Sequence, residues 1–319
     1  MTAYSILIPF TPKRPEQVLP YAAMVQHTGA HRLWQGQAHF IEAHQNFAYA
    51  AGAGFRVPIG LGVTLMPLRH PYEAALQARS LAMTTGHPVI AGFGPGNRPL
   101  QQGLRGAPYP SPLTAAREYL TAVRGLLDGK HVALEGDYVT CEAELEPFTA
   151  PRVDVGLGVL RPAMARLAGE VADTAITWLT SADYLRHTVV PALREGAASA
   201  GRPVPRLTAI VPLALRRPDR PAAEIALASN AVHLRRPHYT DMLRRSGIDV
   251  SGDDRAAGAE ALVKGDAFLS GDRDQLTEKL AEYKAAGADE VVLNVTGVWR
   301  TYGTQAALEE LKGLLAALV

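Results

Sequence analysis

Short apolar segments alternate with longer segments of helical periodicity along most of this chain. The first apolar segment, Tyr4–Phe10 (YSILIPF), has the character of a buried strand, and Glu16–His27 after it repeats apolar residues at helical spacing. This order recurs, and we predict strands at Tyr4–Phe10, His31–Gln35, Val57–Leu65, His87–Phe93, Val153–Leu160, Asp173–Leu179, Arg206–Leu215 and Asp289–Val295. We predict helices at Glu16–His27, Ile41–Ala53, Tyr72–Thr84, Leu113–Leu127, Pro162–Val171, Asp183–Ala200, Asp274–Ala286 and Thr304–Leu318.

Eight strands, most of them followed by a helix, match the count of a (β/α)8 TIM barrel, an α/β fold built on a parallel sheet. A doubly wound open sheet, which usually has fewer strands, is the second interpretation. Three stretches interrupt the pattern as loop insertions: we predict a loop at Gly94–Pro112, a hairpin at His131–Pro147 and an irregular helical segment at Asp219–Gly271. No repeat or low-complexity linker divides the chain, so we predict one barrel domain over residues 1–319.

Length and composition agree with a globular α/β protein. The chain has 319 residues, of which 47% are hydrophobic and 20% charged, and it is long enough to bury a large core. The net charge of +1 gives no electrostatic basis for binding nucleic acid or an anionic membrane. Cys141 is the single cysteine, so an internal disulfide is impossible. Neither a signal peptide nor an apolar run long enough to span a membrane is present, so we expect a cytoplasmic protein.

Glycine is frequent at the C-terminal ends of the predicted strands, where barrels carry their active sites. Gly60–Thr64 (GLGVT) ends the third strand, and glycine there indicates either a bulge beside a ligand or a small residue in a crowded core. Gly92–Arg98 (GFGPGNR) follows the fourth strand and is either a phosphate loop or a plain turn. Its similarity to a dinucleotide-binding fingerprint is weak, because we predict a proline-broken loop after it and not a helix.

The end of the fifth strand, Gly156–Met164 (GLGVLRPAM), is the most informative of these stretches. Pro162 at the first position of a helix costs no hydrogen bond. The N–H groups of Ala163 and Met164 are then free at the positive end of the helix dipole, which favours a phosphate. Arg161 either adds positive charge to that site or is a solvated side chain in a tight turn.

Histidine and tryptophan provide weaker signals. The ten histidines lack the spacing of metal ligands, and no nucleophile elbow is present, so we predict no metal site. His70, which precedes a proline at the start of a helix, is expected to be structural. Trp34, Trp178 and Trp299 lie near strand ends, where they either line a pocket for a flat ligand or pack in the core.

Three segments together indicate a family: Gly60–Pro71 (GLGVTLMPLRHP), His87–Asn97 (HPVIAGFGPGN) and Arg161–Asp173 (RPAMARLAGEVAD). With them the chain resembles the luciferase-like monooxygenases, over nearly its whole length. The stretch RPAMARLAGEVADTAITWLT is similar in particular to the coenzyme F420-dependent branch. The resemblance implies a luciferase-like barrel that binds F420, a deazaflavin, or alternatively FMN at its C-terminal mouth. It also implies a cis peptide bond at Gly62–Val63 behind the flat ring.

The resemblance further implies which residues contact the ligands. Gly62 would keep side-chain atoms away from the ring face, and the stretch from Gly158 to Ala163 would grip the phosphate. The implied cofactor-binding residues are Gln37, Gly62, Val63, Thr64, Gly94, Gly96, Asn97, Gly158, Val159, Leu160, Arg161, Pro162, Ala163 and Met164. We assign Phe10, His39 and Trp178 to substrate binding and assign no catalytic residue.

Two positions depart from the family pattern. Gln37 and Ala38 follow the second strand, where many relatives have an acidic residue or a histidine, and Asn97 stands where sugar-phosphate dehydrogenases have a glutamate. Because neither Gln nor Asn can act as a general acid, we do not expect sugar-phosphate oxidation. The proton that completes a reduction would come from water, a tyrosine or His39.

We therefore expect an F420-dependent oxidoreductase, a reductase that delivers hydride from reduced F420 to a C=C or C=N bond of a small or peptide-like organic substrate. The alternatives are an FMN-dependent monooxygenase and a non-catalytic flavin-binding barrel. F420 carries an acidic oligoglutamate tail, for which Arg98, Arg105 and Arg161 could form a basic rim. A homodimer is a further expectation.

Overall fold

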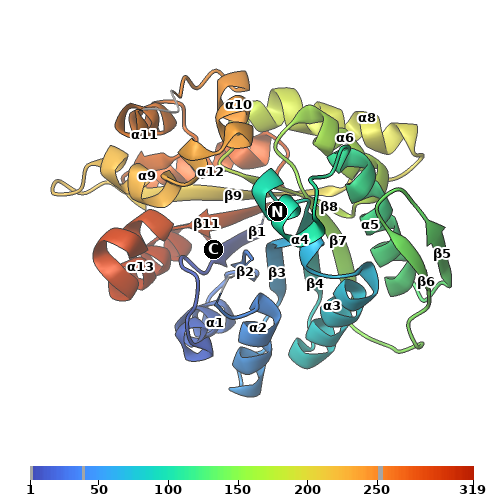
Figure 1. Cartoon of the computed structure of the whole chain (residues 1–319). Helices are drawn as coiled ribbons and strands as arrows, with labels where there is room; N and C mark the ends of the chain where they lie inside the picture. Colours follow the sequence, from blue (N-terminus) through green and yellow to red (C-terminus); the bar gives the residue numbers. More distant parts are fainter. Residues whose placement is uncertain (1–2, 38–39, 251–253) are drawn as a thin grey trace.

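The computed structural model describes residues 3–37, 40–250 and 254–319. Parallel strands lie in the middle of the molecule and helices surround them (Figure 1). Eight strands close into a barrel in the order β1, β2, β3, β4, β7, β8, β9, β11, with β11 pairing to both β9 and β1. This closure confirms the predicted (β/α)8 barrel. The barrel strands are β1 (Ala3–Leu7), β2 (Leu33–Gln35), β3 (Ile59–Leu65), β4 (Val89–Gly94), β7 (Val153–Gly158), β8 (Thr174–Trp178), β9 (Arg206–Leu215) and β11 (Glu290–Asn294).

Helices cover the outside of the barrel, and most begin at a capping side chain or a proline in the first turn. Ser111 caps α5 and Asp272 forms a capping box with Gln275 at the start of α12. The α-helices are α1 (Leu19–His27), α2 (Ala43–Gly52), α3 (Pro71–Thr85), α4 (Arg98–Arg105), α5 (Pro112–Leu127), α6 (Pro162–Val171), α7 (Ala182–Tyr184), α8 (Val190–Ser199), α9 (Ala222–Asn230), α10 (Pro237–Arg245), α11 (Arg255–Lys264), α12 (Arg273–Ala285) and α13 (Thr296–Leu318). The predicted hairpin is confirmed as β5 (Val132–Glu135) paired antiparallel with β6 (Thr140–Ala143).

The barrel interior is filled by side chains, so it is a packed core and not a channel. One buried cluster occupies it, with members from six of the strands: Leu7, Trp34, Ile90, Ile176, Ile210 and Val292. Trp34 is fully buried there, and its Nε1 donates a hydrogen bond to Glu290 at 2.6 Å. Of the two interpretations of Trp34, core packing is therefore the correct one.

The prediction of a loop at Gly94–Pro112 was wrong, because helix α4 lies within it. Asn97 caps this helix by accepting a hydrogen bond from the Leu100 N–H at 3.0 Å. Pro99 falls in the first turn, where proline removes no helical hydrogen bond. Strand β4, which ends at Gly94, is thus followed after a short turn by helix α4. This order of strand, glycines and helix is the one that a dinucleotide-binding fingerprint requires and that the sequence analysis did not predict here.

The second half of the chain differs from prediction in three places. The segment Asp219–Gly271 contains α9, α10, α11 and also a short strand, β10 (Leu269–Gly271), which pairs with the outer part of β9. The helix predicted at Asp183–Ala200 includes a π-helical turn at Leu185–Val189. Helix α13 begins at Thr296, eight residues earlier than predicted, and bends at Gly303, whose φ of 81° is not helical.

Candidate active site

Strand β3 carries a bulge at the C-terminal mouth of the barrel. Its register to β4 shifts between Leu61 and Thr64, and the Gly62–Val63 peptide bond is cis, as the resemblance implied. The Gln37 N–H donates to the Val63 carbonyl at 3.1 Å, and Thr64 Oγ1 donates to the Gly92 carbonyl at 3.1 Å. The bulge thus brings Gln37, Val63 and Thr64, three predicted cofactor residues, to one place.

The side chain of Val63 lies between two glycines on neighbouring strands. A Cβ atom at Gly94 would come within 2.9 Å of Val63 Cγ2, and one at Gly158 within 3.2 Å of Val63 Cγ1. Strands β3, β4 and β7 pair in that order, so these three residues form one continuous surface, which we call the Val63 cradle (Val63, Gly94 and Gly158). The surface has a single side chain at its centre, with glycines on the two neighbouring strands, an arrangement that suits a flat ligand.

Gly62 lies against the crowded interior of the barrel. A Cβ atom at this position would lie 3.0 Å from both Trp34 and Ile210, in the buried cluster inside the barrel. Glycine is needed here because the interior is crowded, and the expectation that Gly62 clears the ring face of a cofactor stays a prediction. Strand β3 thus has both a bulge and a crowded core at its glycines, and the ligand beside the bulge stays a prediction.

The start of helix α6 is built as predicted, with one correction. Pro162 is the first helical residue and Arg161 the N-cap. The Met164 N–H is not free, because it bonds to the Arg161 carbonyl at 3.1 Å; the Ala163 N–H makes no such bond among the described residues. The Arg161 side chain forms an ion pair with Asp241 of α10 at 2.7 Å.

The loops beside this helix are fixed by hydrogen bonds. The Val159 N–H donates to the Ile176 carbonyl at 2.8 Å, and the Tyr184 hydroxyl donates to the Leu160 carbonyl at 2.9 Å. On the other side of the mouth, Gly96 has a φ of 73°, and Gln101 Nε2 donates to its carbonyl at 2.9 Å. Gln101, which sequence reasoning missed, therefore anchors the predicted Gly96–Asn97 loop to α4.

Sequence reasoning also missed a carboxylate beside Gln37. Glu42 accepts a hydrogen bond from Gln37 Nε2 at 3.1 Å and forms an ion pair with the buried Arg69 at 2.9 Å. His44, with Nδ1 3.9 Å from the carboxylate, contributes most to holding the pKa of Glu42 down to about 2, and Arg69 and Gln37 add to this, whereas burial acts in the opposite direction. Glu42 is therefore ionised at neutral pH and cannot serve as a proton donor.

This low pKa predicts how stability depends on pH. A carboxyl group whose pKa is lowered in the folded state stabilises the fold above its ordinary pKa, and the contribution is lost as the pH falls toward the lowered value. We expect the free energy of unfolding to fall more steeply from about pH 5 toward the folded-state value near 2 in the wild type than in Glu42→Gln. Urea titrations at several pH values measure this difference. Glu260→Gln, at an exposed position, is the control, and parallel curves for Glu42→Gln and the wild type would contradict the assignment.

Aromatic side chains lie near two parts of the mouth. Phe10 stacks on Trp299 with ring centroids 4.9 Å apart, and Trp178, at the end of β8, is half-buried and packs on the interior cluster together with Val63. His39 lies outside the described residues. His70 is structural as expected: it caps α3 by accepting from the Tyr72 N–H, and its Nε2 lies 2.8 Å from the Thr140 carbonyl.

Two of the three arginines of the expected basic rim contact other side chains of the protein. Arg105 lies over the Tyr109 ring, 3.8 Å from its centroid, and Arg161 is paired as described. Arg98 is exposed at the start of α4. Within the part of the chain that the structure describes, no group of three or more His, Cys, Asp or Glu residues could hold a metal ion, and no helix is long and apolar enough to cross a membrane.

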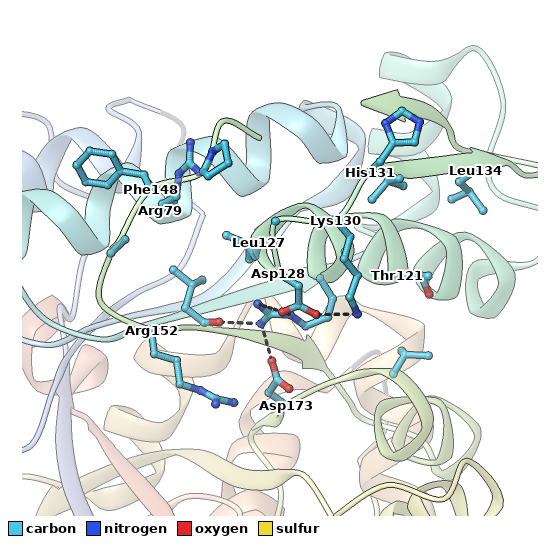
Figure 2. Close-up of a pocket in the computed structure, with 18 of the residues that line it drawn as sticks. Arg79, Thr121, Leu127, Asp128, Lys130, His131, Leu134, Phe148, Arg152 and Asp173 are labelled. Atoms are coloured by element: carbon cyan, nitrogen blue, oxygen red, sulfur yellow. Dashed lines mark hydrogen bonds and ion pairs between the residues drawn. The ribbon is translucent and has the colours of Figure 1, made fainter. Parts of the chain in front are cut away.

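A large cleft of 1110 Å³ lies away from the bulge, where β7 and β8 begin. Several of its charged side chains are paired with one another: Arg124 contacts both Asp128 and Asp173, and Lys130 lies 3.4 Å from Asp128 (Figure 2). Because active sites of barrels lie at the opposite, C-terminal ends of the strands, size alone does not make this cleft the site. The bulge, the Val63 cradle and the start of α6 together form the candidate active site.

Comparison with known proteins identifies the family of the chain. The family model of luciferase-like monooxygenases matches residues 3–290. The chain belongs to the luciferase-like monooxygenase family. Among curated relatives of this family member, the 5,10-methylenetetrahydromethanopterin reductase of Methanolobus tindarius is 28% identical over 265 residues, which cover 81% of this chain and 79% of that protein.

Solved structures with other names share the fold of this luciferase-like protein. The coenzyme F420-dependent tetrahydromethanopterin reductase of Methanopyrus kandleri superposes with a TM-score of 0.75 at 23% identity, covering 98% of this chain and 97% of that one. The oxygenating constituent of 3,6-diketocamphane monooxygenase from Pseudomonas putida, in complex with FMN, gives a TM-score of 0.76 at 16% identity, covering 100% and 98%. At these identities the similarity establishes the fold alone.

Proposed function

We propose that this protein is an F420-dependent reductase that transfers hydride from reduced F420 to a C=C or C=N bond of an organic substrate. The observation that carries the proposal is the similarity, over four fifths of the chain, to a protein named as a reductase. Gln37 and Asn97 differ from the residues that we expect in sugar-phosphate dehydrogenases. This difference also favours a reductase. The substrate is a small or peptide-like organic molecule.

The residues at the mouth fit a flat cofactor with a phosphate group. Two strands contribute glycines to the Val63 cradle at positions where a Cβ atom would press on Val63. The Ala163 N–H is free of partners among the described residues and lies at a helix start that begins with Pro162, which is the arrangement that binds phosphate. The Val63 cradle would hold the ring and the start of α6 the phosphate, and the bound cofactor would supply the hydride.

The chain's own residues position the ligands and control protons. Glu42 orients the Gln37 side chain by accepting from its Nε2, and its low pKa keeps it ionised. Gln37 and Asn97 are amides and carry no transferable proton at neutral pH. The proton that completes the reduction therefore comes from water, a tyrosine or His39.

Titration of the purified apoprotein with F420 and, separately, with FMN tests the proposal. We expect F420 to bind with micromolar or tighter affinity, followed by its fluorescence, and FMN to bind more weakly. Turnover of reduced F420 with activated alkenes or imines should follow. Preference for FMN together with oxygen-dependent turnover would overturn the reductase. F420 binding without turnover across such a panel would favour the non-catalytic barrel.

Filling the Val63 cradle should weaken cofactor binding without unfolding the protein. In Gly158→Val, the new side chain enters the space beside Val63, where even a Cβ atom lies 3.2 Å from Cγ1. We expect the affinity for F420 to fall at least tenfold, with an unchanged circular dichroism spectrum. Gly52→Val is the control, because nothing lies within 4 Å of a Cβ atom there. Unchanged F420 affinity in Gly158→Val would show that the ring binds elsewhere.

An FMN-dependent monooxygenase is the second candidate. It is favoured by the match of residues 3–290 to the family model of luciferase-like monooxygenases. The same two titrations separate the candidates.

A further inference from the structure

We propose that Trp178 and His233 form a substrate subsite that binds a flat conjugated molecule by ring stacking and by one hydrogen bond to an acceptor atom of that molecule. This inference deepens the proposed function and rests on it for the identity of the reaction. His233 had no role in the sequence analysis. It lies in the segment after β9 whose structure was predicted least well.

The position of Trp178 places it in the same layer as the bulge of β3. Trp178 is the last residue of β8, and both it and Val63 pack on the cluster that fills the barrel. Its ring is half-buried, and its Nε1 atom is buried with no hydrogen-bond partner among the described residues. A buried N–H group that lacks a partner is costly, so it marks a place where a ligand can supply the acceptor.

His233 forms the continuation of this aromatic surface. It belongs to the 3-10 turn η4 (His233–Arg235), and its ring lies 5.5 Å from that of Trp178 at an interplanar angle of 32°. Tyr239 contacts the His233 ring edge-on, with centroids 4.7 Å apart, and so holds it in place. His233 Nδ1 is also buried without a partner in the described part of the chain.

Further buried polar atoms without partners in the described part of the chain lie on α9 and β11. Ser229 Oγ and Asn230 Oδ1 lie at the end of α9, directly before η4, and Asn294 Nδ2 lies at the end of β11. Helix α13 continues from β11 and meets α9, where Arg300 Nη1 donates to the Ala228 carbonyl at 2.9 Å. An aromatic pair whose two ring nitrogens are buried without partners among the described residues has the composition of a binding surface with few, oriented polar groups.

The chemistry of the two rings defines the ligand class. Burial, followed by the charges of Arg300, His238 and Arg236, lowers the pKa of His233 to about 4, so its imidazole is neutral at pH 7. The indole N–H of Trp178 can only donate. Two neutral aromatic rings favour a flat ring by stacking, and a lone indole donor selects a carbonyl oxygen or an imine nitrogen on that ring.

Two flat ligands with the same carbon skeleton, of which only one carries acceptor atoms, test the subsite. Menadione is flat and carries two carbonyl oxygens, and 2-methylnaphthalene has the same carbon skeleton without them. Equilibrium dialysis of the purified full chain, without added cofactor, measures both affinities. In Trp178→Phe, which keeps a ring but removes the N–H, we expect menadione to bind about three- to tenfold more weakly and 2-methylnaphthalene to bind as in the wild type.

A second variant tests the stacking partner independently. His233→Leu should weaken both ligands, because it removes a ring face that both would use. His187→Leu is the matched control, since His187 is 65% exposed and pairs with Asp183 at the surface. It should leave both affinities unchanged. Thermal melts establish that each variant is folded.

The outcomes separate this subsite from the cofactor proposal. Equal weakening of both ligands by Trp178→Phe, no weakening of either, or no binding of either ligand to the wild type would overturn the subsite. Because the dialysis contains no cofactor, failure of F420 to bind in its own titration would remove the proposed function and leave the subsite result standing.

Discussion

Replacing Glu290 with alanine should lower the free energy of unfolding by about 3–5 kcal/mol. Glu290 is 5% exposed at the start of β11 and accepts hydrogen bonds from Ser5 Oγ at 2.5 Å and from Trp34 Nε1 at 2.6 Å. It also pairs with Arg32, which is 3% exposed, at 3.4 Å. The alanine variant would leave a buried positive charge and two buried donors without their acceptor.

Urea denaturation measures this effect against two comparison variants. Glu290→Gln keeps one acceptor oxygen and should lose less than the alanine variant. Asp183→Ala removes an exposed carboxylate that lies 2.9 Å from His187, and should cost less than about 1 kcal/mol. If Glu290→Ala lowers the free energy of unfolding no more than Asp183→Ala does, the stability of the barrel does not depend on the Glu290 carboxylate.

Gly196→Ala should destabilise the protein by about 3 kcal/mol, although alanine normally favours a helix over glycine. Helices α6 and α8 cross with their backbones in contact at this glycine. A Cβ atom at Gly196 would overlap the Arg166 carbonyl oxygen, and one at Gly169 would approach the Ala197 nitrogen to 2.7 Å. The obstructing atoms belong to the backbone, so they cannot move aside, and α8 would be pushed away from α6.

The same substitution at an open position gives the opposite sign. Gly103 lies within α4, where a Cβ atom would meet nothing within 4 Å. Gly103→Ala should therefore stabilise the protein by up to about 1 kcal/mol. Thermal and urea unfolding of the two variants side by side measure the difference. A Gly196→Ala variant as stable as Gly103→Ala would mean that the helices can separate at no cost.

Local patterns were sufficient to predict the barrel and one part of the site. Each barrel strand is a short apolar run followed, after a turn, by helical spacing, and Pro162 marks the start of α6 in the sequence itself. Helix α4 was missed because Pro99 was interpreted as a helix breaker, whereas Asn97 and the first-turn position make it a normal start.

Contacts between distant residues were beyond such patterns. Glu42 forms an ion pair with Arg69, which is 27 positions away and adds to the larger effect of His44 on the pKa of Glu42. Nothing in the sequence around Glu42 or Arg69 predicts that ion pair. The sequence left open whether Trp34 lines the mouth or fills the core. Its position in the core depends on the hydrogen bond to Glu290, which is 256 positions later. Gly62 was correctly placed at the bulge, but the reason for glycine there, the packing of Trp34 and Ile210, required the closed barrel.

The ion pair between Arg161 and Asp241 joins the start of α6 to helix α10. Asp241 is held in turn by Arg245 at 3.0 Å, so the pair is part of a small charged network and not an isolated contact. These ion pairs therefore connect the helix start that we propose to hold phosphate with the segment that contributes His233. If this connection couples the two binding sites, cofactor and substrate must change each other's affinity by the same factor, because binding free energies are linked reciprocally. Order of binding would then be a matter of rates alone.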